Sequence, residues 1–214
     1  MTAAPPACGI CGTRCRPPFR APAAELAPDL DGRPGEPARA PHGRWVARSP
    51  GCGAAAPDLA ALPASAAPIV RRDDYAAEPD RFLRWSILAA ATGDPAAAAE
   101  AILQAAWRQE DEGHDATALR RRAAAIWTGD PLRRIDILRR AGALAEAEAE
   151  AASLTGLDED QRRILDFQRA RIAAGDTARY AISSALRPPA RTPHVTHGQR
   201  APARTGLLSR LFGR

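Results

Sequence analysis

The sequence predicts a mainly α-helical protein with a small zinc-ribbon-like module at its N-terminus. Two observations carry this prediction. All four cysteines lie within the first 52 residues, in a stretch rich in Pro and Gly, and apolar residues then recur with a 3.6-residue period from about Asp73 to Leu186. We therefore divide the chain into a ribbon-like module at 1–70, an antiparallel helical domain resembling tetratricopeptide repeats (TPR-like) at 71–186, and a disordered basic tail at 187–214.

Two short cysteine turns define the ribbon-like module. Residues 8–12 read CGICG and residues 49–53 read SPGCG, so that Ser49 stands where a second pair of cysteines would begin. Two facing turns of this kind supply the four ligands of a structural zinc site. The sequence predicts a zinc site, and a degenerate ribbon without metal is the alternative. The predicted metal ligands are Cys8, Cys11 and Cys52, with the fourth place open to Cys15, His42, Ser49 or water.

A thiol redox function is a further interpretation of the first cysteine turn. A thioredoxin-like pair sits where a strand meets a helix, which lowers the pKa of one thiol. Prolines precede this turn and Pro17 follows it, and no βαβ pattern lies nearby. The redox interpretation therefore requires a cysteine with a low pKa from some other source.

Seven helices are expected in the second part of the chain, at 80–91, 95–112, 116–127, 131–141, 144–155, 159–174 and 177–186. The sequence Thr-Gly-Asp-Pro occurs at 92–95 and at 128–131, and each copy offers a C-terminal Gly, an N-cap Asp and a first-turn Pro. Their spacing of 36 residues is close to the TPR period of about 34. A TPR-like array is thus predicted, with a generic antiparallel helical bundle as the alternative.

Charged and aromatic residues of both parts are expected to serve structure. Trp85, Trp107 and Trp127 lie on predicted helices and should pack in the core, whereas residues 110–114 (EDEGH) should form a solvated helix end. The acids and arginines between the cysteine turns could be paired carboxylates for acid–base chemistry. We favour a network that bonds the loop backbone, made by Asp29, Asp31, Arg33, Glu36 and Arg39.

The segment between the cysteine turns resembles a bacterial family of uncharacterised proteins, known only as a domain of unknown function. Residues 28–36 read PDLDGRPGE, and Trp45 and Val46 come just before the second turn. This family is similar in having a split zinc ribbon followed by TPR-like helices. The resemblance covers about residues 8–60 and implies Cys8, Cys11, position 49 and Cys52 as ligands, but it implies no activity.

Charge and composition bear on where in the cell the protein is expected. All 30 basic residues are Arg, six of them follow Leu186 without any acid, and the rest of the chain has 24 basic and 25 acidic residues. No apolar run reaches the roughly 20 residues of a membrane span, and the N-terminus has no signal-peptide core. Four cysteines without such a signal indicate metal in a reducing cytosol, so we expect a cytoplasmic protein.

The sequence therefore predicts a non-enzymatic scaffold that binds a protein or peptide in a groove of its helices. No P-loop, zinc-protease or nucleophile-elbow motif supports an enzyme. Nucleic-acid binding through the ribbon and the arginine tail is the alternative, and thiol redox chemistry is the second alternative.

Overall fold

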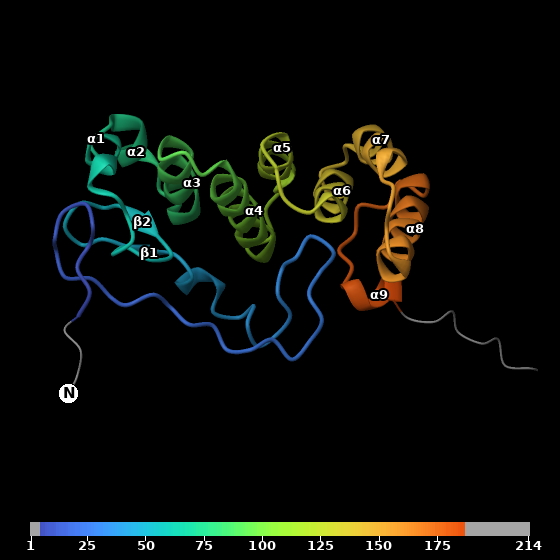
Figure 1. Cartoon of the computed structure of the whole chain (residues 1–214), viewed down its shortest axis with the longest axis horizontal. Helices are drawn as coiled ribbons and strands as arrows, with labels where there is room; N and C mark the ends of the chain where they lie inside the picture. The colour runs from blue at the N-terminus through green and yellow to red at the C-terminus, as the bar shows by residue number, and fades with distance from the viewer. Residues whose placement is uncertain (1–4, 187–214) are drawn as a thin grey trace, which may run out of the picture.

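The computed structural model describes residues 5–186, so the predictions for the arginine tail lie outside the described residues. Helices α3 to α8 stand side by side in a curved row, and an N-terminal segment runs along the concave side of that row (Figure 1). The prediction of a mainly α-helical fold is confirmed. In the described part of the chain, 51% of residues are helical and strands form one two-stranded sheet.

Six of the seven predicted helices occur within two residues of their predicted ends. The reason is local, because each has an apolar stripe at helical spacing. These helices are α3 (Arg81–Ala91), α4 (Pro95–Asp111), α5 (Thr117–Ala125), α6 (Pro131–Arg140), α7 (Leu144–Ser153) and α8 (Glu159–Ala173).

The two Thr-Gly-Asp-Pro corners are not equivalent. Gly93 has φ of +86°, and the carboxylate of Asp94 accepts from the amide of Ala97, as a helix stop followed by an N-cap requires. Asp130 also caps its helix, but α5 ends at Ala125, several residues before the second corner's glycine. The second corner therefore starts a helix without ending the previous one.

The last predicted helix, 177–186, is wrong over its first half. Only α9 (Ile182–Leu186) is helical. Residues at and just before its start pair instead with the N-terminal segment. Leu30 donates its amide to Tyr180 O at 3.0 Å, and Ile182 donates its amide to Pro28 O at 2.8 Å. A backbone partner far away in sequence has replaced the local helical bonds.

The N-terminal part combines short elements. Strands β1 (Ala47–Arg48) and β2 (Ala55–Ala56) pair antiparallel, with Ala47 opposite Ala56. They are flanked by the 3₁₀ turns His42–Arg44 and Ala64–Ala66, and by two short helices that the sequence pattern did not predict, α1 (Ala67–Val70) and α2 (Asp73–Ala77). Together they close one end of the helical row (Figure 1).

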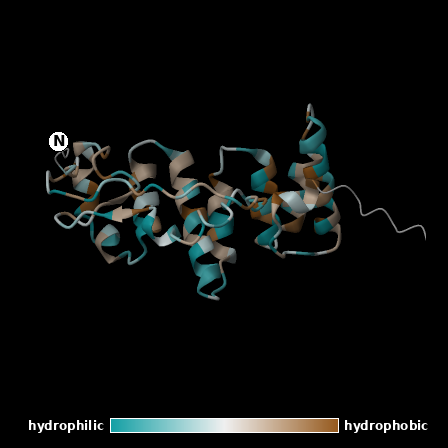
Figure 2. Cartoon of the chain, turned by 90° about the horizontal axis from the view of Figure 1, so that it is seen from below, coloured by the Kyte–Doolittle hydropathy of each residue, from teal (hydrophilic) through white to brown (hydrophobic). Residues whose placement is uncertain are grey.

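One hydrophobic core joins the two parts of the chain. Leu30, Val46 and Ala55 are buried in the same cluster as Phe82 and Trp107 of the helices. From α3 to α9 each helix packs against the next in sequence, and brown hydrophobic stretches lie toward the inside of the row in Figure 2, with teal ones on outer sides. The N-terminal segment thus completes the core on the concave side.

Candidate metal centre

The first cysteine turn is a tight loop closed by backbone hydrogen bonds. Cys8 donates its amide to Thr13 O at 2.9 Å, and Gly12 donates to Cys8 O at 2.8 Å. Gly12 has φ of +70°, a left-handed conformation that a residue without a Cβ adopts at little cost. The turn points both cysteine side chains to one side, as a pair of metal ligands requires.

The second turn joins β1 to β2 and faces the first one. Ser49 donates its amide to Ala54 O at 2.8 Å, and Gly53 donates to Ser49 O at 3.0 Å. A Cβ at Gly51 would lie 2.3 Å from Thr13 Oγ1 and 3.1 Å from Cys11 Sγ. Glycine at this position therefore lets the two turns approach closely.

Three thiols meet where the turns face each other. The Sγ atoms of Cys8, Cys11 and Cys52 all lie within 4.8 Å of one another, so these three cysteines could hold a metal ion. Cys8 Sγ lies 3.9 Å from Cys52 Sγ, close to the sulfur–sulfur separation of about 3.8 Å that a tetrahedral site with 2.3 Å metal–sulfur bonds would have. The chemistry and spacing of the three sulfurs fit such an ion.

Ser49 lies beside the same three sulfurs. Its hydroxyl oxygen is 3.5 Å from Cys11 Sγ and 3.5 Å from the amide of Cys52, and the side chain is buried. An oxygen ligand at about 2.0 Å from the metal would lie about 3.5 Å from a sulfur ligand in a tetrahedron. The hydroxyl thus lies at the distance from Cys11 Sγ that a fourth ligand would have.

The other two candidates for the fourth ligand lie elsewhere. Cys15 is buried, and its thiol donates to Pro6 O at 3.3 Å. His42 stacks on Phe82 with ring centroids 4.7 Å apart, and burial lowers its pKa to about 4. Neither belongs to the group of three thiols in the described part of the chain.

The pKa of the Cys11 thiol is lowered by its neighbours. Hydrogen bonds from Thr13, and next from Ser49, lower its pKa to about 6, whereas burial is the largest cause that raises the pKa of Cys52. Cys11 is also exposed. A thiolate at neutral pH is the form that binds metal and that reacts as a nucleophile.

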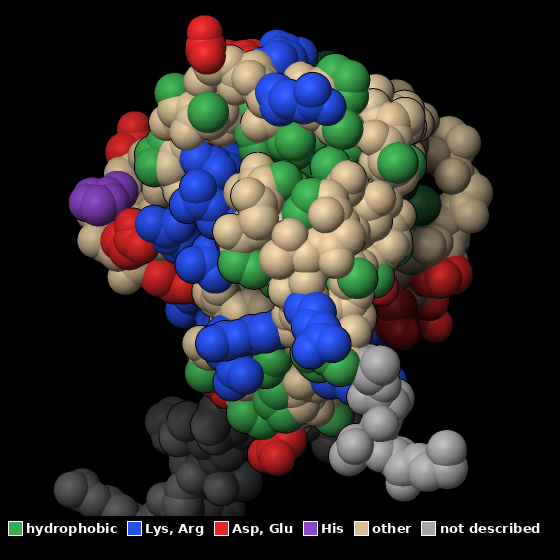
Figure 3. All heavy atoms as spheres, turned by 90° about the vertical axis from the view of Figure 1, so that its left-hand side faces the viewer, with side chains coloured by type: hydrophobic (Ala, Val, Ile, Leu, Met, Phe, Trp, Pro, Cys, Tyr) green, Lys and Arg blue, Asp and Glu red, His purple; other side chains and the backbone are tan. Residues whose placement is uncertain are grey.

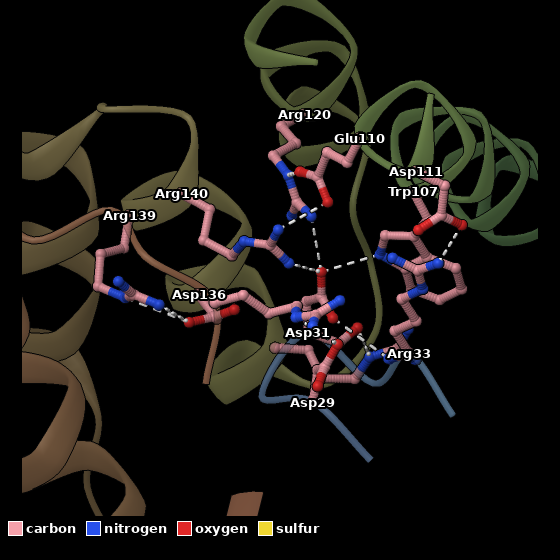
Figure 4. Close-up of polar contacts among 12 residues, drawn as sticks. Asp29, Asp31, Arg33, Trp107, Glu110, Asp111, Arg120, Asp136, Arg139 and Arg140 are labelled. Carbon is pink, nitrogen blue, oxygen red and sulfur yellow. Dashed lines mark hydrogen bonds and ion pairs between the residues drawn. The ribbon is translucent and has the colours of Figure 1, made fainter. Parts of the chain in front are cut away.

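A second constellation lies on the concave side of the helices, around the buried carboxylate of Asp31 (Figure 4). Asp31 Oδ2 accepts from Trp107 Nε1 at 2.8 Å, from Arg120 at 2.9 Å and from Arg140 at 2.8 Å. Burial alone would raise the pKa of Asp31, but these two guanidinium groups and the indole N–H outweigh it and hold the pKa at about 2.

Neighbouring charges extend this constellation along the row. Arg33 pairs with Asp111, and Arg39 pairs with Asp29 at 2.8 Å. The predicted network is therefore present around Asp29 and Arg39, but Asp31 and Arg33 bind helices far away in sequence rather than loop backbone alone.

The prediction that residues 110–114 form a solvated helix end is wrong for Glu110, which is partly buried, whereas Asp111 is exposed and still bonds a buried arginine. Glu110 accepts from Arg120 at 2.6 Å and from Arg140 at 2.6 Å, and Asp111 accepts from the buried Arg33. The sequence shows only acids at a helix end. Their partners are arginines on other helices and on the N-terminal segment, which no local pattern reveals.

Comparisons of the chain with protein-family models, with curated proteins and with solved structures give no match. Within residues 5–186, no helix combines the length and the apolar character needed to cross a membrane.

Proposed function

We propose that this chain is a non-enzymatic scaffold that binds an extended segment of a partner protein along the concave side of α4 to α9, with a zinc ion holding its N-terminal module together. The observation that carries the proposal is the chain's own segment around residues 25–40, which lies on that side (Figure 1). An extended segment held there by the same chain is a template for one supplied by another protein.

The contacts of this segment indicate the chemistry of such a partner. Its backbone is paired at Pro28 and Leu30, through bonds that do not depend on side-chain identity. Between Asp29 and Arg33, the carboxylate of Asp31 fills a pocket of two guanidinium groups and an indole N–H. The partner segment would therefore be extended, with an acidic residue at the place of Asp31.

A labelled peptide of residues 25–40 tests this proposal in trans. The full chain carrying Asp31→Asn should bind the peptide, because its own segment is held less tightly. The natural chain should not, since its attached segment competes at high effective concentration. A peptide that itself carries Asp31→Asn is the matched control and should bind weakly. The proposal would be contradicted if the Asp31→Asn chain folded but did not bind the natural peptide, and if a folded Leu30→Ala chain did not bind it either.

The proposed ion is zinc, held by Cys8, Cys11 and Cys52. Thiolates favour zinc among the common divalent ions, and closed sites of this kind are structural. Ser49 or a water would take the fourth place. Bound zinc would tie the two cysteine turns together and stabilise a module with little core of its own.

Thiol redox chemistry is a second candidate, favoured by one observation: Cys11 is exposed and has a pKa of about 6. In metal-free protein, Cys11 should be alkylated with a midpoint near pH 6, much faster than the buried Cys15, whose pKa burial raises. Peptide mapping by mass spectrometry from pH 5 to 9 checks this. Reversible formation of a disulfide between Cys8 and Cys11 would favour redox chemistry, whereas thiols that only zinc protects would favour the structural site.

A further inference from the structure

A groove lined by arginines lies next to the metal centre, at the end of the molecule that Figure 3 faces. It encloses about 900 Å³ between residues 14–20, the strand residues 46–48 and the start of α3, and none of the described residues that line it is Asp or Glu. Its charged residues are all exposed arginines, namely Arg14, Arg16, Arg20, Arg44, Arg48 and Arg81.

These six arginines differ from most others in the structure. Arginines on the helical row are paired with acids, as Arg133 is with Glu100 at 2.9 Å and Arg169 with Glu148 at 2.8 Å. Within residues 5–186, none of the six groove arginines has a carboxylate oxygen within 4.0 Å. In the described part of the chain, their charges converge on one hollow without a neutralising acid, although the sequence up to Leu186 has nearly equal numbers of basic and acidic residues.

The groove also carries an aromatic ring. The guanidinium of Arg44 lies 4.3 Å from the centroid of the partly exposed Phe19 ring, and Pro17, Pro18 and Val46 add apolar lining. Unpaired arginines contact phosphates, while an aromatic ring and a stacked guanidinium offer flat surfaces to a base. A duplex presents no free base faces to such a surface, and an acidic peptide has no bases to stack.

We propose that this groove binds single-stranded nucleic acid, with the arginines on its phosphates and a base stacked at Phe19 and Arg44. The site is separate from the concave side of the helical row. Because it depends on charge, its affinity should fall steeply with salt.

Fluorescence anisotropy with the full chain and a labelled 15-nucleotide oligouridine tests this proposal between 50 and 200 mM salt. The double variant Arg16→Gln/Arg20→Gln should weaken binding by roughly tenfold or more at 50 mM salt and lower the log–log salt slope by about 1.4, because each single-strand phosphate contact contributes about 0.7. The matched control is Arg122→Gln/Arg162→Gln. It removes two exposed helical arginines that also have no carboxylate oxygen within 4.0 Å in the described structure, and should leave affinity within about twofold.

A second variant separates single-strand recognition from mere attraction of negative charge. Phe19→Leu should weaken oligouridine binding by about fivefold or more while leaving the salt slope unchanged, since it removes stacking and no charge. Equal losses in the two arginine double variants would overturn the proposal. So would an unaffected Phe19→Leu chain, or competition by polyglutamate or anionic phospholipid vesicles as strong as that by unlabelled oligouridine at matched charge.

Discussion

Replacing Asp31 with Ala is expected to lower the free energy of unfolding by about 3–5 kcal/mol, the usual cost of removing one member of a buried ion pair. The variant leaves Arg120 and Arg140 facing an empty pocket and the Trp107 indole N–H without an acceptor. Glu110 still bonds both arginines, which keeps the loss from growing further. Denaturant unfolding measures the loss.

The matched control for this prediction is Glu159→Ala, which breaks an ion pair with Arg163 on the surface of α8. Exposed pairs contribute about 0–1 kcal/mol, so this change should be small. A similar small effect for Asp31→Ala would mean that the N-terminal segment does not depend on its carboxylate, and it would also weaken the proposal of an acidic partner segment.

The stability of the fold at low pH should depend on the same carboxylate, that of Asp31. The folded pKa of Asp31 is about 2, below the ordinary 3.8, so its ionised form stabilises the fold above pH 4 and that contribution is lost as the pH falls toward 2. Asp136 acts in the opposite direction, because burial raises its pKa to about 6 and protonation favours the fold between about pH 6 and 4. Asp31→Asn should flatten the loss below pH 4 and reduce the change above it, because the charge of Asp31 is one of the causes that raise the pKa of Asp136.

The sequence could predict the features that depend on residues close to one another in the chain. The helix ends at Gly93, Asp94 and Pro95 follow from residues next to each other, and the apolar stripes repeat every turn. The grouping of Cys8 and Cys11 follows from a tight turn in the same way. Placing Cys52 and Ser49 beside them required only that two similar turns face each other.

The sequence could not predict the concave side. Asp31 meets Trp107, Arg120 and Arg140, residues 76, 89 and 109 positions away. Charge patterns along a helix show which residues are polar, but not that an acid at the end of α4 and an arginine of α6 meet in space. The expectation of a helix through Tyr180 failed for the same reason, since its carbonyl bonds Leu30 rather than a residue one turn away.

The largest expected effect at the metal centre is a rise in zinc affinity in the variant Ser49→Cys. The Ser49 hydroxyl already lies 3.5 Å from Cys11 Sγ beside the three thiols. A thiol there would complete a four-sulfur tetrahedron, and a thiolate binds zinc far more strongly than a neutral hydroxyl. Zinc affinity should therefore rise by roughly a hundredfold, and the thermal stability of the zinc-loaded chain should rise with it because binding is coupled to folding. Competition with a chromophoric chelator measures the affinity.

Two further variants test whether the gain in zinc affinity depends on a thiol at position 49, the place of the fourth ligand. Cys15→Ser should leave zinc affinity unchanged, because the Cys15 thiol donates to Pro6 O, away from the three sulfurs. Ser153→Cys adds a thiol at the exposed end of α7 and should also change nothing. Loss of binding in Cys15→Ser would mean that the N-terminal segment rearranges around the metal to bring Cys15 in. If neither the natural chain nor Ser49→Cys bound zinc, the two turns would be held together without a metal ion, and the proposed metal centre would be wrong.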